Sequence, residues 1–243
     1  MATLLNELRE SIRRDEKGRF MRGKVPWNKG LTSETDERVR KNTESSSKTR
    51  RGTGLIKPNL SPSTDLAYVL GALKGDGWVG YVRGRGTGFI NFKSIVKVSA
   101  SSVMQALKNI NLHPRIKLEK KQGIHGIWSV NANSRTFVDW YRSLSLDEIK
   151  EIIKGYESHF IRGFYEAEGS IQRPPHIQVH IYNTDLNLLN LVKESLNKIE
   201  IESKTILARK GFKKIKPCYQ LYFCGIKKVH HFLQETQPVI KVL

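Results

Sequence analysis

Two stretches of the sequence share one pattern, and this repeat constrains the fold more than any other feature. The first, 66–81, begins as an apolar segment and holds Gly71 and Gly75 four residues apart, a spacing that puts both on one face of a helix. The second, 160–171, aligns with it without gaps. Glycine inside a helix costs about 1 kcal/mol relative to alanine, and close approach of a second backbone would offset that cost. The repeat therefore predicts two helices packed on their small residues.

In both copies an acid follows the small residues. The two acids, Asp76 and Glu168, are 92 positions apart, a period too long for a solenoid and suited to two fused half-domains. A carboxylate at the C-terminal end of a helix opposes the helix dipole, so its presence twice argues against chance. Packing on the small residues would bring the acids side by side. The aligned pairs are Gly71 with Gly163, Gly75 with Ala167, Asp76 with Glu168, and Gly77 with Gly169.

The two stretches resemble the paired motifs of LAGLIDADG homing endonucleases, in the single-chain form with two pseudo-symmetric halves. The nine-residue cores are 69–77 and 161–169. The sixth position of the motif is Asp in the sequence that names the family, whereas here it is Lys74 in the first copy and Glu166 in the second. This position varies in the family and does not perform the chemistry. The resemblance starts near residue 61. It implies an α+β (mixed α/β) fold of two αββαββα half-domains, 61–152 and 153–243, whose antiparallel sheets form a DNA-binding saddle.

The resemblance also implies a function. The expected protein is a monomeric, site-specific double-stranded DNA endonuclease of the intron-homing kind, which hydrolyses phosphodiester bonds with Mg²⁺ or another divalent cation such as Mn²⁺. Asp76 and Glu168 would be the catalytic, metal-binding acids, and the carbonyl groups of Gly75 and Ala167 would assist them. The family also places basic and amide side chains around the acids. From the expected strand register, the candidates for these positions are Lys97, Gln172 and Asn183.

Alternating apolar and polar residues predict strands, including 89–99, Arg115–Lys121, 177–182 and Cys218–Cys224. In each half the polar face of the sheet should be free. Joined, the two faces would form a basic saddle wide enough to follow a DNA major groove, where side chains read base edges. A solvated sheet face is the plainer interpretation, but it does not account for the net charge of +12 on residues 61–243. The candidate DNA-binding residues on these faces are Asn91, Lys93, Arg115, Lys117, Gln178, His180 and Tyr182.

Residues 1–60 differ from the rest, with 15 Lys and Arg against 8 Asp and Glu. Composition alone fits a disordered basic arm. The stretch 17–32, however, is similar to the small DNA-binding modules attached to homing nucleases, and this similarity implies an extended segment along phosphates or in the minor groove. Residues 45–63 are predicted to be a linker. The candidate DNA-binding residues of this segment are Arg19, Arg22, Lys24, Trp27 and Lys29.

The net charge of +19 and the pI of about 10 predict a polyanionic partner. A ribosomal or membrane-surface protein would share this balance, but no apolar run reaches the roughly 18 residues of a membrane span. No secretory signal is visible, and Cys218 and Cys224 fit a reducing interior, so an intracellular protein is expected. Intein splicing is not expected, since the terminal residues it needs are missing.

A second interpretation stays open. The chain could be a nucleic-acid-binding protein that keeps the same fold without cleavage, such as a maturase acting on intron RNA or a regulator. The presence of the acid in both motifs favours the nuclease.

Overall fold

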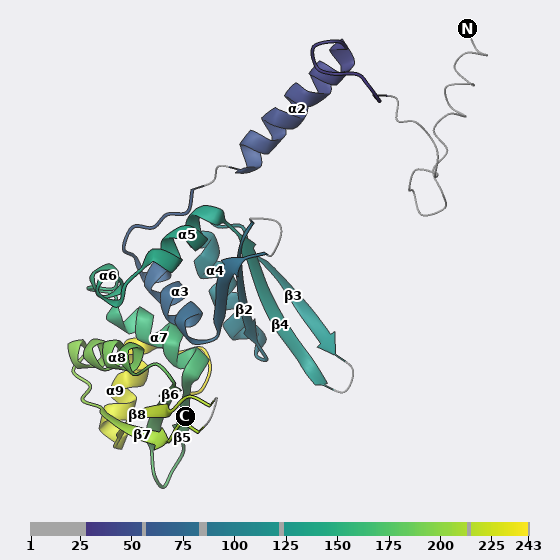
Figure 1. Ribbon diagram of the computed structural model, residues 1–243. Helices are drawn as coiled ribbons and strands as arrows, with labels where there is room; N and C mark the ends of the chain where they lie inside the picture. The colour runs from purple at the N-terminus through teal and green to yellow at the C-terminus, as the bar shows by residue number, and fades with distance from the viewer. Residues whose placement is uncertain (1–27, 55–56, 83–86, 122–123, 213–214, 243) are drawn as a thin grey trace. The chain divides into compact units, whose positions relative to one another are not determined.

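The computed structural model describes residues 28–54, 57–82, 87–121, 124–212 and 215–242 (Figure 1). The chain divides into two compact units, Met1–Leu55 and Ile56–Leu243. In the first unit, a turn closed by a hydrogen bond from Leu31 N to Asn28 O precedes helix α2 (Glu37–Gly54). This helix reaches into the stretch 45–63 that the sequence predicted as linker. Its first turns contain an ion pair between Glu37 and Lys41 at 3.1 Å, a spacing that supports helices.

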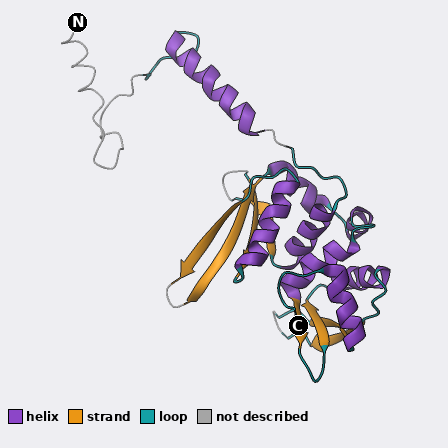
Figure 2. Ribbon diagram, turned by 180° about the vertical axis from the view of Figure 1, so that it is seen from behind, coloured by secondary structure: helices purple, strands orange, loops and turns teal. Residues whose placement is uncertain are grey.

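The second unit contains two halves with the same order of elements, each with a four-stranded antiparallel sheet. The strand orders are β1-β2-β4-β3 and β5-β6-β8-β7, and Figure 2 shows the strands in two separate groups. This confirms the predicted mixed α/β fold with two pseudo-symmetric halves. The first half comprises α3 (Thr64–Gly75), β1 (Gly77–Tyr81), β2 (Gly88–Ser94), α4 (Lys97–Asn109), β3 (Arg115–Lys121), β4 (Ile124–Asn133) and α5 (Arg135–Ser143). The second comprises α7 (Glu157–Glu168), β5 (Gly169–Gln172), β6 (Gln178–Asn183), α8 (Leu186–Lys198), β7 (Lys204–Arg209), β8 (Cys218–Cys224) and α9 (Ile226–Thr236).

One helix was not predicted. Helix α6 (Leu146–Ile152) lies between the two halves and begins with a capping box, in which Ser145 and Glu148 bond each other's backbone N–H groups. It is short, and only Ile149 is fully buried, so it shows little of the periodicity that identifies longer helices.

Each sheet is covered by helices on one face. Helices α4 and α5 pack on the first sheet, and α8 and α9 on the second. The strand residues that face the helices are buried and apolar, which accounts for the alternation seen in the sequence. They are Ile90, Phe92, Val130 and Ala132 in the first sheet, and Val179, Ile181, Leu221 and Phe223 in the second.

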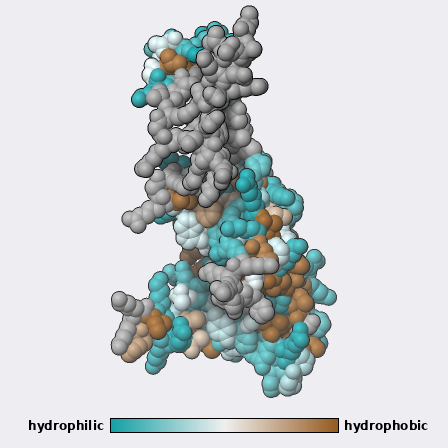
Figure 3. Space-filling view, turned by 90° about the vertical axis from the view of Figure 1, so that its right-hand side faces the viewer, coloured by the Kyte–Doolittle hydropathy of each residue, from teal (hydrophilic) through white to brown (hydrophobic). Residues whose placement is uncertain are grey.

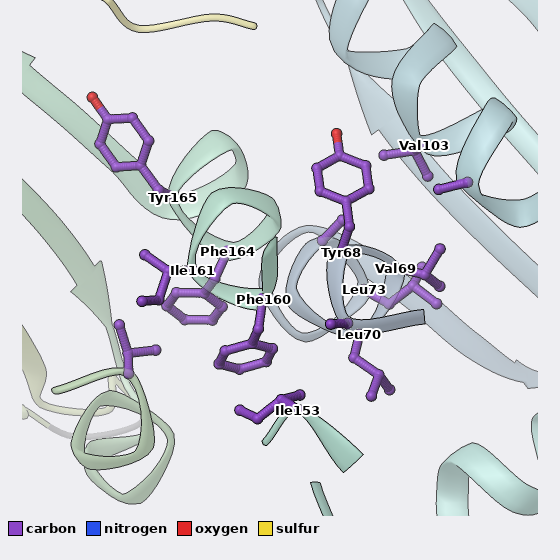
Figure 4. Close-up of a cluster of buried hydrophobic side chains, with 14 of the residues drawn as sticks. Tyr68, Val69, Leu70, Leu73, Val103, Ile153, Phe160, Ile161, Phe164 and Tyr165 are labelled. Carbon is purple, nitrogen blue, oxygen red and sulfur yellow. The ribbon is translucent and has the colours of Figure 1, made fainter. Parts of the chain in front are cut away.

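Helices α3 and α7 pack against each other at the centre of the unit (Figure 4). A Cβ atom at Gly71 would lie 2.1 Å from the carbonyl oxygen of Phe160, and one at Gly163 would lie 2.2 Å from that of Tyr68. The backbones therefore approach too closely for any side chain at these positions. Apolar residues beside this contact, among them Leu70, Phe160 and Ile153, are almost fully buried.

Ser63 caps the first motif helix, and its hydroxyl accepts a hydrogen bond from Leu66 N at 3.2 Å. The structure corrects one detail of the sequence interpretation. The strand predicted over 89–99 ends at Ser94. There the hydroxyl of Ser94 accepts from Val96 N at 3.1 Å, and the chain turns into α4. An alternating pattern that continued beyond the true strand end caused this error.

The surface mixes hydrophilic and hydrophobic areas on the face shown in Figure 3. Among the described residues, no helix has the length and apolar character needed to span a bilayer.

Candidate active site

The two motif acids lie at the same end of the α3–α7 pair. Asp76 is the C-terminal cap of α3, and its backbone N–H donates to Ala72 O at 3.2 Å; Glu168 is the last residue of α7. A Cβ atom at Gly75 would lie 2.5 Å from the Cβ atom of Ala167 and 3.2 Å from Cγ of Glu168. The acids therefore follow directly on a close contact between Gly75 of one helix and the Ala167 side chain of the other.

The electrostatics of the pair are unfavourable without a cation. Asp76 is exposed and Glu168 is half-buried. Burial, and then the negative charge of Asp76, raise the pKa of Glu168 to about 6, while the charge of Lys241 acts in the opposite direction. Asn183, at the end of β6, donates from Nδ2 to Oε1 of Glu168 at 3.2 Å. A raised carboxyl pKa beside a second carboxylate is typical of a functional site and of one that a cation would stabilise.

A third acid, Glu166, has a different environment. Its side chain is almost fully buried and accepts hydrogen bonds from Tyr68 Oη at 2.6 Å, Arg162 Nε at 3.2 Å and Val239 N at 2.8 Å. These bonds link α3, α7 and the segment after α9. Burial, followed by the charge of Glu166, raises the pKa of Tyr68. The sixth motif position of the second copy therefore holds the helix pair together.

Lys241 was not identified from the sequence. Its Nζ atom donates to the carbonyl oxygens of Ala167, at 2.8 Å, and of Tyr165, at 3.4 Å. Burial lowers the pKa of Lys241, whereas Asp76 and Glu168 act to raise it. This places a positive charge beside the motif acids. No periodic pattern could have indicated it, because residues 237–242 belong to neither a helix nor a strand.

The free face of the first sheet presents rows of polar side chains. Strand register aligns Trp78, Asn91, Asn131 and Arg115 across all four strands. The next row contains Lys93, Ser129 and Lys117, and both lysines form ion pairs with Glu119, at 2.8 and 3.0 Å. The four residues predicted for this sheet, Asn91, Lys93, Arg115 and Lys117, thus share one face. Trp78, which is 49% exposed, stands on it too and was missed.

The free face of the second sheet is similar. His180 stands opposite Ser170 and Tyr222, and Tyr222 stands opposite Lys204. Gln178 and Tyr182 lie on the same face, two residues on either side of His180 along β6. The His180 ring stacks on Tyr182 with centroids 6.1 Å apart and contacts the Gln220 amide. The three predicted residues of this sheet therefore form one polar surface.

Comparison with known proteins identifies the fold. Residues 155–237 match the family described as the LAGLIDADG-like domain. The structure is similar to that of the homing endonuclease I-DmoI, with a TM-score of 0.55 and 19% identity over 73% of this chain and 96% of that one. The chain has the two-motif LAGLIDADG fold. The same fold occurs in DUF199/WhiA from Thermatoga maritima, with a TM-score of 0.52 and 19% identity over 74% of this chain and 57% of that one.

Two uncharacterised proteins of Methanocaldococcus jannaschii are related in sequence. MJ0398 is 29% identical over 152 residues, which are 63% of this chain and 55% of the relative. MJ0314 is 31% identical over 163 residues, which are 60% of this chain and 58% of the relative. The chain thus spans little more than half the length of these relatives.

Solved structures of I-DmoI with a TM-score of 0.53 and 0.54 contain DNA with Mn or with Ca.

Two residues expected beside the LAGLIDADG acids lie elsewhere. Lys97 is not on a strand but begins α4, and its ammonium lies 5.1 Å from the centre of the Trp128 ring. Gln172 ends β5 and pairs with Gln178, which puts it on the free face of the sheet. Among the described residues, no hydrogen bond or ion pair joins either side chain to Asp76 or Glu168. Asn183 is thus the member of the predicted trio that reaches an acid.

Most candidates of the N-terminal segment lie outside the described residues, namely Arg19, Arg22, Lys24 and Trp27. Lys29 is described and lies, exposed, in the turn at 28–31, next to Gly30 with a φ of 80°. The described parts of the chain contain no cluster of three or more His, Cys, Asp or Glu side chains able to hold a metal. A metal at the LAGLIDADG acids would therefore need backbone carbonyls, water or substrate oxygens as further ligands.

Proposed function

We propose that the protein is a site-specific double-stranded DNA endonuclease, in which Asp76 and Glu168 hold the divalent metal that cleavage requires. One observation supports this most strongly. A pair of carboxylates, one from each copy of the motif, lies at the same end of two helices in backbone contact. The backbone contacts at Gly71 and Gly163 involve neither acid side chain, whereas Glu166 is bonded to both helices. The acids at the end of the pair are therefore free for chemistry.

The residues present fit a hard divalent cation such as Mg²⁺ or Mn²⁺. Mg²⁺ favours carboxylate and carbonyl oxygens together with water and substrate phosphates. Such oxygens are available from the carboxylates of Asp76 and Glu168 and from the backbone carbonyl groups of Gly75 and Ala167. The two carbonyl groups lie in last helix turns, where carbonyls commonly lack partners within the helix. When bound, the metal would supply a nucleophilic hydroxide and neutralise charge on the departing oxygen. Asn183 would hold the Glu168 carboxylate in place.

The free faces of the two sheets would bind the DNA. The row of Trp78, Asn91, Asn131 and Arg115 supplies donors and acceptors that can read base edges in the major groove. In the second sheet, Gln178, His180 and Tyr182 would act in the same way. The basic excess of residues 61–243 would pair with phosphates. Residues 1–60 would add further phosphate contacts, with Arg19, Arg22, Lys24, Trp27 and Lys29 as first candidates.

A second candidate function is nucleic-acid binding without cleavage, on intron RNA or as a regulator. The observation that favours it is the similarity to DUF199/WhiA. The sequence identity to that protein is 19%, the same as the identity to I-DmoI. Both motif acids are present, however, and a protein that only binds polyanions would gain from losing two negative charges at its surface.

The experiment that separates the two candidates is cleavage of a random duplex DNA library in Mg²⁺, followed by sequencing of the ends produced. We expect a small set of related sites with cleavage of both strands, and no cleavage in EDTA. A library that is bound but left intact in Mg²⁺ and in Mn²⁺ would rule out the nuclease and favour the second candidate. Cleavage that persists in EDTA would contradict the metal site.

A further inference from the structure

The segment that follows α9 runs back to the motif helix α7. It turns at Gln237 and Lys241, whose φ angles of 44° and 59° lie in the left-handed region. Two backbone contacts hold it: Val239 N donates to Glu166 Oε1 at 2.8 Å, and Tyr165 Oη donates to Lys241 O at 2.7 Å. The position of Lys241 is therefore fixed by the fold.

The ammonium group of Lys241 is directed at the end of α7. Its bond to Ala167 O, at 2.8 Å, is the shorter of its two contacts with backbone carbonyls of that helix. Carbonyl groups in a last helix turn attract cations, because they form the negative end of the dipole; Tyr165 O also accepts from Gly169 N, the C-terminal cap of α7. The neighbouring negative charges, in order of effect, are Asp76, Glu168 and Glu166. The ammonium group of Lys241 thus faces the two motif acids and two carbonyls, together with Glu166, which Arg162 also pairs with.

We propose that Lys241 is a built-in cation of this site, which occupies the place beside Ala167 O in the metal-free protein and which a divalent ion displaces on binding. This rests on the proposed function, since it takes the acids and the Ala167 carbonyl as metal ligands. A divalent ion bound to the same oxygen would repel the ammonium group, so the two cations compete for Ala167 O. Lys241 would keep two like charges together before the metal arrives, and it would weaken metal binding.

Lys74 provides a matched control. It also lies at the end of a motif helix and is half-buried. Its ammonium, however, lies 4.8 Å from the centre of the Tyr141 ring, and the negative charge that acts to raise the pKa of Lys74 is that of Asp185. Replacing Lys74 therefore removes a charge of the same kind from the same region without touching Ala167 O.

The first test titrates Mn²⁺ into the full chain without DNA, and follows free aqueous Mn²⁺ by electron paramagnetic resonance. We expect Lys241→Met to bind Mn²⁺ about tenfold more tightly than wild type, since one opposing charge is gone. Lys74→Met should bind as wild type does. Equal or weaker binding by Lys241→Met would overturn the proposal, since Lys241 would then be indifferent to the metal or would assist it.

The second test uses the wild-type protein, so it does not depend on a variant that folds. Lys241 is labelled with an acetylating reagent, with and without Mn²⁺, and the extent is read by mass spectrometry. Displacement by the metal predicts faster labelling of Lys241 in Mn²⁺, and an unchanged or slower rate would contradict it. Glu168→Gln tests the proposed metal site separately from the role of Lys241. Mn²⁺ binding that is unchanged in Glu168→Gln refutes the proposed metal site, whereas Glu168-dependent binding with no effect of Lys241 refutes this inference alone.

Discussion

Gly71 and Gly163 make the same contact in opposite directions across the central helix pair. A Cβ atom at Gly71 would lie 2.8 Å from Phe164 N, and one at Gly163 would lie 2.8 Å from Ala72 N. The backbone of one turn of the opposite helix thus packs directly against each glycine. The two contacts are related by the pseudo-symmetry of the chain. This reciprocity sets the distance between the helices, and with it the spacing of the two acids at their ends.

Substitution of either glycine by leucine should unfold the protein. Overpacking a close contact costs about 1–3 kcal/mol or more, and here the obstacle is a backbone, which cannot move aside as a side chain can. Thermal melts of Gly71→Leu and Gly163→Leu check this. Gly155→Ala serves as the control, since Gly155 has open space around it and only its φ of 82° disfavours a side chain. If Gly71→Leu and Gly163→Leu melt at the wild-type temperature, the two helices tolerate separation and the prediction is wrong.

Glu166→Ala should be strongly destabilising. It leaves the hydroxyl of Tyr68, the guanidinium of Arg162 and the N–H of Val239 without their acceptor. Breaking a buried charge pair typically costs about 3–5 kcal/mol. The control Glu194→Ala breaks the exposed pair with Lys150, which should cost little, since solvent screens such pairs. Chemical denaturation of both variants measures the difference, and equal costs would contradict the role given to Glu166.

The raised pKa of Glu168 predicts a pH-dependent stability. A carboxyl group whose pKa is about 6 in the folded protein, against an ordinary value of 4.5, binds its proton more tightly when folded. The metal-free protein should therefore gain stability from this group as the pH falls through about 6 towards 4.5. In EDTA, Glu168→Gln should melt above the wild type at neutral pH, and the gap should close in acid. A gap that widens in acid would contradict the assignment.

Sequence patterns predicted some parts of this structure well and others poorly. The strands Arg115–Lys121 and Cys218–Cys224 have the bounds expected, because their alternation ends where the strands end. Lys97 was misplaced because the alternation of 89–99 continued past Ser94, and a local side-chain bond starts the next helix there. Lys241 could not be predicted. Its contact with Ala167 joins residues 74 positions apart through a segment without regular structure, and no periodicity reports such a contact.

Removal of residues 1–60 should weaken DNA binding without moving the cleavage site. Their 15 basic residues would contact phosphates, and each such contact adds about 0.9 to the slope of log K against log salt. A chain that starts at Ser61 should show a shallower slope and lower affinity on specific and scrambled duplexes alike. A shifted or relaxed cleavage site would instead mean that the segment reads bases. An unchanged slope would mean that it does not contact the DNA.

The most direct test of the proposed metal site measures cleavage and binding together in Asp76→Asn and Glu168→Gln, on a duplex that the wild-type protein cuts in Mg²⁺. Each variant removes a negative charge that the proposed metal needs and that the helix contact does not. Neither variant should cleave the duplex, in Mg²⁺ or in Mn²⁺, while both should bind it at least as tightly as the wild type does. Cleavage near the wild-type rate by either variant would contradict the proposed metal site.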